Sequence, residues 1–243
     1  MIRIGCAGWS LPRAVQERFA PGASHLERYA SRFNATEISS SFHRPHERWV
    51  YERWASAVPG SFRFFAKLPR TITHDQRLVD CPALLQAFFA QACGLGHKLA
   101  GVLVQLPPSL AFDAAVARNF LELLRQHHGH LIALEPRHPS WFERDADDLL
   151  RSLRVARVLA DPVRHAAGRA PGGWPQLIYL RLHGSPRIYH SPYPATLVDA
   201  LSVRIRRAAR EGHDIWCIFD NTASGAAAGD ALALQDALQR ETP

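Results

Sequence analysis

The chain has 243 residues, of which 47% are apolar and 21% are charged. These proportions exclude a disordered chain, a collagen, a heptad rod and a small disulfide-rich scaffold. The formal net charge is +7, and it is carried almost entirely by arginine because Lys67 and Lys98 are the only lysines.

Short apolar runs recur along the chain, with helical stretches between them. The runs span residues 2–7, 35–38, 62–66, 101–105, 131–134, 156–160, 177–182 and 215–219. They start about 21 to 39 residues apart, which is the length of a strand–helix repeat. Because strands that are buried on both faces are apolar throughout, these runs indicate a parallel sheet.

The connecting segments carry signals for helix starts and stops. Ser24 and Asp113 are predicted N-caps, and Pro82 suits a first helical turn. Gly212 is predicted to end a helix that starts before Leu197, and residues 225–229 are predicted to begin the last helix.

The sixth connection, residues 161–176, contains several glycines and prolines and is predicted to be a loop. The pattern predicts an α/β fold, with residues 1–243 forming a single (β/α)8 TIM-type barrel domain whose sixth crossover is irregular. An open doubly wound sheet is the alternative. The sequence gives no indication of the number of subunits.

The four cysteines form no C-x-x-C pair, which argues against a zinc knuckle or a thioredoxin-type motif. The first residues lack the pattern of a signal peptide, and no apolar stretch reaches the roughly 20 residues that span a bilayer. We therefore expect a cytoplasmic protein with no membrane partner.

Active sites of barrel enzymes lie at the C-terminal ends of the strands. Ionisable residues follow most of the predicted strands, and some fall inside them, where a charge is costly unless it is paired. Candidate catalytic residues are Glu37, Glu135, His183, His138 and Asp161. Candidate substrate-binding residues are Lys67, Arg70, His74, Gln105, Arg137, Arg181, Asn221, Trp9 and Trp141.

Several motifs that carry these residues resemble the YecE-like family, known as domain of unknown function seventy-two. They are TEISSSF at 36–42, KLPRTITH at 67–74, QLPP at 105–108, EPRHPSW at 135–141, LAD at 159–161, YLRLHG at 179–184 and FDNT at 219–222. The resemblance implies a TIM barrel and no settled activity. Ser39 and Asp220 depart from it, because the family usually has Asn at both positions.

The favoured hypothesis is an enzyme that acts on a small anionic substrate bearing a phosphate or a carboxylate. The arginines and Lys67 would bind the anion. Glu135 or Glu37 would act as general base, with His183 or His138 as the acid. For each Arg–Glu pair, a structural ion pair is the competing interpretation.

Two other functions stay open. The carboxylates and histidines could bind a divalent metal for hydrolysis or isomerisation, but no metal-ligand spacing supports this and no cofactor is predicted. Nucleic acid is a further candidate partner, with Trp9 and Trp141 stacking on bases. No basic stripe supports that interpretation, since the arginines are scattered. A ligand-binding module without catalysis is a further alternative.

Overall fold

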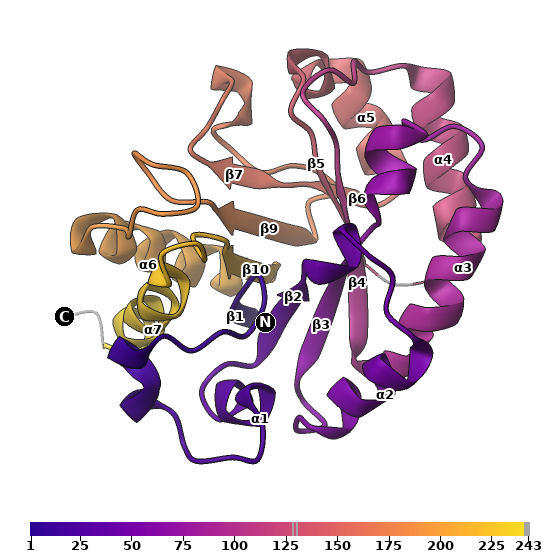
Figure 1. The fold of residues 1–243 in the computed structure, drawn as a ribbon. Coiled ribbons are helices and arrows are strands. Elements are labelled where there is room, and N and C mark those ends of the chain that lie inside the picture. Colours follow the sequence, from indigo (N-terminus) through magenta and orange to yellow (C-terminus); the bar gives the residue numbers. More distant parts are fainter. Residues whose placement is uncertain (128, 130, 241–243) are drawn as a thin grey trace.

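The computed structural model describes residues 1–127, 129 and 131–240, and its strands form two sheets (Figure 1). The first sheet has six strands, in the order β2-β3-β4-β5-β6-β8. These are β2 (Ala35–Ile38), β3 (Arg63–Lys67), β4 (Leu99–Gln105), β5 (Leu131–Glu135), β6 (Val155–Arg157) and β8 (Gly172–Gly173). Every pair in it is parallel except β6 with β8.

The second sheet has four parallel strands, in the order β1-β10-β9-β7. These are β1 (Ile2–Cys6), β10 (Asp214–Phe219), β9 (Leu177–Leu182) and β7 (Leu159–Asp161). A single parallel bridge between Ala7 and Glu37 links the two sheets on one side. On the other side, the chain passes directly from β6 through Val158 into β7.

The predicted α/β class with mainly parallel strands is therefore confirmed. The predicted closed barrel is confirmed only in part, because the hydrogen bonds divide the described strands into two sheets. All eight predicted apolar runs contain strands. The run at 156–160 is divided between β6 and β7.

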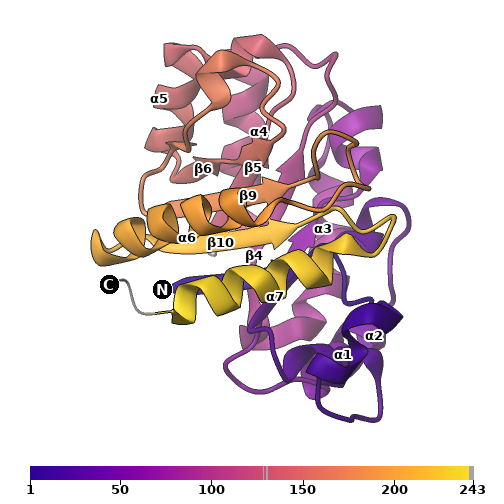
Figure 2. The same ribbon diagram turned by 90° about the vertical axis from the view of Figure 1, so that its left-hand side faces the viewer.

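Seven α-helices are found in the described chain, and they cover the outside of the strands. They are α1 (His25–Ala30), α2 (Arg48–Ser56), α3 (Pro82–Ala92), α4 (Ala114–His127), α5 (Arg144–Ser152), α6 (Ala195–Arg210) and α7 (Ala226–Gln239). Figure 1 shows α2 to α5 along the six-stranded sheet. Figure 2 shows α6 and α7 side by side along the other sheet.

The helix boundaries follow the signals in the sequence. Ser24 caps α1 in a capping box with Glu27, and Pro82 lies in the first turn of α3. The Asp113 carboxylate accepts hydrogen bonds from two backbone N–H groups at the start of α4. Gly212 follows α6 with a φ of 91°, a conformation that glycine adopts without strain.

The sixth crossover is a loop, as predicted. Between β7 and β9 the described chain has no α-helix, and it forms only a 3-10 turn (Ala166–Gly168) and the two-residue strand β8. As a result, no α-helix lies between α5 and α6 among the described residues.

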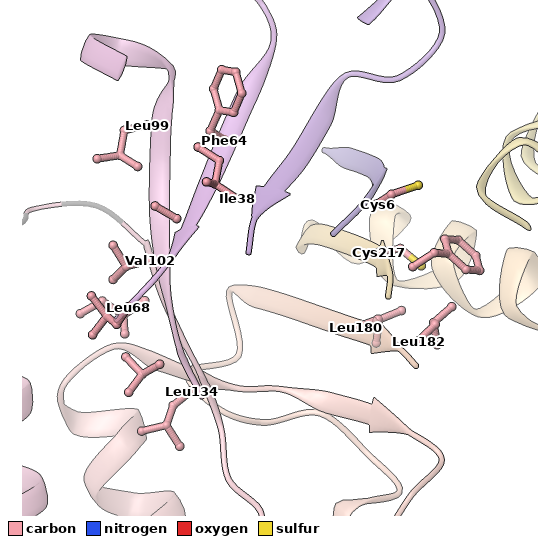
Figure 3. Close-up of a cluster of buried hydrophobic side chains, with 14 of the residues drawn as sticks. Cys6, Ile38, Phe64, Leu68, Leu99, Val102, Leu134, Leu180, Leu182 and Cys217 are labelled. Carbon is pink, nitrogen blue, oxygen red and sulfur yellow. The ribbon is translucent and has the colours of Figure 1, made fainter. Parts of the chain in front are cut away.

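The apolar core has two layers. The inner layer lies among the strands and includes the packed rings of Phe65, Tyr179 and Trp216. The outer layer lies between strands and helices, and Figure 3 shows members of it, such as Val102 and Leu134. No helix of the described residues is long and apolar enough to cross a membrane.

The inner layer depends on a glycine in β4. A Cβ on Gly101 would lie 2.4 Å from Cζ of Phe65 and 2.5 Å from the backbone oxygen of Leu131. We expect Gly101→Ala to lower the free energy of unfolding by about 1–3 kcal/mol, because the core has no room for the methyl group. Urea unfolding measures this.

Gly60→Ala is the control, since a Cβ at Gly60 would meet nothing within 4 Å. Equal stabilities for the two variants would contradict the close packing at Gly101.

Candidate active site at the C-terminal ends of the strands

A layer of polar side chains lies on top of the inner apolar layer. Successive side chains of a strand point to opposite faces, so a residue two positions after an inner one also points inward. Each polar residue lies two positions after a residue of the inner layer. The pairs, with the inner-layer residue first, are Ala35 and Glu37, Phe65 and Lys67, Leu103 and Gln105, Ala133 and Glu135, Tyr179 and Arg181, and Ile218 and Asp220. The period of the strands thus gathers side chains from six strands at one end.

Arg181 lies at the centre of this layer, with a side-chain exposure of 0%. Its Nε and Nη2 donate to the two oxygens of Glu37 at 2.9 and 2.8 Å. Its Nη1 donates to Oε2 of Glu135 at 2.5 Å, and Nη2 also donates to Oδ2 of Asp220 at 2.9 Å. Three carboxylates raise the pKa of this guanidinium although burial opposes them.

This arrangement differs from the role expected for Arg181 as a clamp for the substrate anion. The guanidinium is enclosed, and four hydrogen bonds to protein carboxylates use most of its donors. Arg181 is a structural cation that holds Glu37, Glu135 and Asp220 together.

Glu37 also differs from its expected role as a general base. Besides Arg181, it accepts hydrogen bonds from the hydroxyls of Tyr179 at 3.0 Å and Ser39 at 2.7 Å. Its exposure is 0%, so a substrate has no access to either oxygen. Ser39, one of the two departures from the family pattern, therefore orients Glu37.

Glu135 is held as a carboxylate by its neighbours. Its Oε1 accepts from Gln105 at 2.8 Å and from Nε of Arg137 at 3.1 Å. Burial alone would raise the pKa of Glu135, but Arg181, His183 and Arg137 hold it well below the ordinary value. Such a carboxylate is a weak base, so it suits orientation of a partner better than removal of a proton.

His183 lies between two carboxylates. Its Nδ1 is 2.9 Å from Oδ2 of Asp220, and its Nε2 is 3.5 Å from Oε1 of Glu135. Burial would lower its pKa, but Glu135 and Asp220 raise it overall. Nε2 is buried and has no hydrogen-bond partner in the described chain. The two carboxylates thus favour the protonated form of the His183 imidazole, and Nε2 lies beyond ordinary hydrogen-bond distance of Glu135.

Lys67 is a further basic side chain that points inward in this layer. It is 8% exposed, and its Nζ lies 3.9 Å from the ring centre of Phe42. No hydrogen bond or ion pair to this ammonium is found within residues 1–127, 129 and 131–240. Burial and the nearby Arg181 lower its pKa to about 8, against the opposing effect of Glu37, Glu135 and Asp220.

A pocket opens beside Glu135 and His183, with an empty volume of about 480 Å³ that includes open solvent; Lys67 is not among its lining residues. Its lining includes Glu135, Arg137, Phe142, Arg164, His183 and Tyr189. The Tyr189 ring stands edge-on to His183 at 5.6 Å, so it shields the imidazole. Burial and the charges of Lys67, Arg70 and Arg137 lower the pKa of His74, against the opposing effect of Asp75.

Several predicted site residues lie outside this cluster and have structural contacts. His138 accepts from the backbone of Ser140 at the start of a 3-10 turn, and Asp161 accepts from the Tyr193 hydroxyl at 2.8 Å. Asn221 donates to Asp230 at 2.6 Å.

Three further predicted residues make contacts within the protein that do not involve the cluster. Trp141 is 1% exposed and donates to the backbone oxygen of Leu110, so it is not available for stacking on a base. Trp9 packs edge-on against Trp54 at 5.0 Å. Arg70 forms an exposed ion pair with Asp75.

Sequence reasoning left Asp220, Tyr179 and Tyr189 out of the candidate site. Tyr179 precedes Arg181 by two residues, so strand alternation was the signal that could have found it. Asp220 immediately follows an apolar strand, and the alternation that places Ile218 inward applies to it as well. Tyr189 lies in the loop after β9, and no sequence pattern identifies it.

The described residues contain no group of three or more His, Cys, Asp or Glu side chains arranged to bind a metal ion. Of the carboxylates that the sequence offered as ligands, Glu37 and Glu135 are bound to Arg181, and Asp161 accepts the Tyr193 hydroxyl. The guanidinium supplies the positive charge between the two glutamates.

Comparisons with known proteins agree on one family. The family model described as "Protein of unknown function DUF72" matches residues 3–243. The chain is 31% identical over 175 residues to UPF0759 protein YecE of Escherichia coli K12, a match that covers 69% of this chain and 62% of that protein.

Two solved structures share the fold. A DUF72 family protein from Enterococcus faecalis V583 superposes with a TM-score of 0.82 at 21% identity, covering 100% of this chain and 97% of the other. One from Thermotoga maritima MSB8 gives 0.78 at 23% identity, covering 99% and 100%.

The Arg181 cluster yields a stability prediction. We expect Arg181→Met to lower the free energy of unfolding at neutral pH by about 3–5 kcal/mol, because three buried carboxylates lose their shared cation. Chemical denaturation of the two proteins measures the difference. Arg210→Met, at an exposed position near the end of α6, should change it by less than about 0.5 kcal/mol. A loss below about 1 kcal/mol for Arg181→Met would refute the structural role.

Proposed function

Because the chain belongs to the DUF72 family, whose description names no activity, we propose a function from the chemistry of the site. The protein is an enzyme that binds a small substrate carrying a carboxylate or a phosphate. Lys67 and Arg137 hold the anion, and Lys67 and His183 transfer protons.

The observation that carries this proposal is the unpartnered ammonium of Lys67. The only other lysine, Lys98, has the same exposure of 8%, but its Nζ donates to the backbone oxygens of Ala55 and Val58 at 2.5 and 2.6 Å. Buried charges are normally paired, since an isolated one is costly. An anionic ligand would supply the partner that Lys67 lacks.

The charges of the cluster support an anion over a cation. With His183 protonated, the form that its raised pKa favours, Glu37, Glu135 and Asp220 are balanced by Arg181, Arg137 and His183. Lys67 adds a positive charge to this set. A substrate anion would therefore lower the net charge of the site toward zero.

Proton transfer is assigned to Lys67 and His183, whose pKa values the polar layer shifts in opposite directions. Lys67, with its pKa of about 8, can accept or release a proton under ordinary conditions. His183 presents Nε2–H beside the pocket, while Asp220 fixes its other nitrogen. Glu135 orients Arg137 and raises the pKa of His183. In this proposal Glu135 is not the general base, the role that the sequence suggested for it.

The closed (β/α)8 barrel is part of this proposal. The Ala7–Glu37 bridge and the uninterrupted passage of the chain from β6 into β7 support it. In a closed barrel, the polar layer forms the floor of one active site at the C-terminal end of a single domain.

Lys67→Met tests the anion site, with sulfate as the probe because its charge is constant near neutral pH. We expect the wild type to bind one sulfate per chain and the variant to bind it at least about tenfold more weakly. Titration calorimetry measures both. Lys98→Met is the matched control, which is expected to lose stability but to keep its sulfate affinity.

The wild-type affinity for sulfate should also fall as the pH rises through about 8, because only the ammonium form of Lys67 binds. Equal affinity of Lys67→Met and wild type would exclude the site.

His183→Gln distinguishes an enzyme from a module that only binds. Wild-type protein is screened for turnover of phosphate monoesters and of 2-hydroxy and 2-oxo acids. For any substrate found, the variant should keep its affinity for sulfate and lose about 100-fold or more in kcat, because the general acid is absent. Unchanged kcat would remove His183 from the mechanism. Sulfate binding without turnover of any compound would favour the binding module.

A further inference from the structure

The irregular sixth crossover leaves an apolar groove on the outside of the four-stranded sheet. In β9, the residues with even numbers, Ile178, Leu180 and Leu182, point outward, opposite to Tyr179 and Arg181. A regular strand–helix repeat would cover this face with a helix after β7. The loop at 161–176 contains none; Leu180 and Leu182 are nonetheless buried, whereas Leu159 and Ile178 keep part of their surface exposed.

The groove has an empty volume of about 1270 Å³, open solvent included. The sheet side is formed by Leu159 and the outward residues of β9, and the loop side by Ala170 and Pro171. The third side is a stripe on α6 that includes Leu197, Ala200, Leu201, Arg204, Ile205 and Ala208. At about 1.5 Å per residue, this stripe is about 16 Å long.

Three charged residues line this otherwise apolar groove: Arg169, Arg204 and Asp161. Arg169 and Arg204 are exposed, and no ion pair or hydrogen bond of either guanidinium group is found within the described chain. The Asp161 carboxylate already accepts the hydroxyl of Tyr193. The groove therefore combines an apolar channel with two unpaired guanidinium groups, and guanidinium binds carboxylates in a bidentate way.

We propose that this groove binds a single-chain amphiphile with a carboxylate head, of the chemical class of the fatty acids. The acyl chain lies between α6 and the outer face of β9, where it removes the exposed surface of Leu159, Ile178 and Leu201 from water. The carboxylate is bound by Arg204 and Arg169. This site is separate from the pocket beside His183 and does not depend on the proposed enzymatic function.

Dodecanoate, below its micellar concentration, is the probe, and titration calorimetry is the measurement. The wild type should bind one molecule per chain. Ala200→Trp fills the groove and should weaken binding at least about tenfold. Val203→Trp is the matched control, because Val203 is 55% exposed on the same helix but does not line the groove. Its affinity should stay within about twofold of the wild type.

The head group is tested with charge variants. Arg204→Ala and Arg169→Ala should each weaken dodecanoate binding by about fivefold to tenfold. The exposed Arg210, two turns further along α6, is the control and should have no effect when changed to Ala. Dodecyltrimethylammonium, which has a similar chain and a positive head, should bind at least about tenfold more weakly.

Three results would overturn the proposal: no saturable binding of dodecanoate, equal binding of the cationic amphiphile, or unchanged affinity of Ala200→Trp. Binding that occurs only to anionic lipid vesicles, with none to free dodecanoate, would also overturn it and indicate a membrane surface instead. Lys67→Met should bind dodecanoate like the wild type. A loss in that variant would place the ligand at the other site and refute the groove.

Discussion

The buried guanidinium of Arg181 is the interaction on which the rest of the site depends. Arg181 belongs to β9 in the four-stranded sheet, whereas Glu37 and Glu135 belong to β2 and β5 in the six-stranded sheet. One cation therefore binds carboxylates of the six-stranded sheet from a strand of the four-stranded sheet. The backbones of the two sheets are joined by the Ala7–Glu37 bridge on one side and by the passage of the chain from β6 to β7 on the other. A shift of one residue in β2 or β5 would turn its carboxylate toward the helices and leave Arg181 unpaired. The ion cluster thus fixes the register of strands that are not neighbours.

The same cluster determines which groups are left for a ligand. Arg181 binds three carboxylates, so none of them can fully neutralise Lys67, whose ammonium rests on the Phe42 ring. Glu135 and Asp220 stay ionised because of Arg181, and they in turn raise the pKa of His183. The shifted pKa values of Lys67 and His183 are therefore a consequence of a structural ion cluster. Glu37, Glu135 and Arg181, which the sequence suggested as bases and a substrate clamp, bind one another in this cluster.

Local signals in the sequence predicted much of the fold. Apolar runs located the strands, and Ser24, Pro82, Asp113 and Gly212 located helix ends, because each acts on its own backbone. Strand alternation, with its period of two, also puts Glu135 and Arg137 on one face and Arg181 and His183 on one face. The roles within the site were not predictable in this way. Arg181 meets its partners across 46 and 144 residues, and the contrast between Lys67 and Lys98 depends on carbonyl groups from α2 and the turn after it. Residue type predicts the possible partners, and only the packing of distant strands decides among them.

The loop at 161–176 shows how one local irregularity affects both sides of the sheet. Arg164 and His165 line the pocket beside His183, whereas Arg169, Ala170 and Pro171 line the groove along α6. Asp161, at the start of the loop, also lines the groove, so the chain passes from the groove to the pocket and back within a few residues. On the outer face of β9, Leu180 and Leu182 are buried, and the loop leaves Ile178 partly exposed. The same short stretch of backbone thus shapes both linings, because Gly168 lines the pocket and the next residue, Arg169, lines the groove.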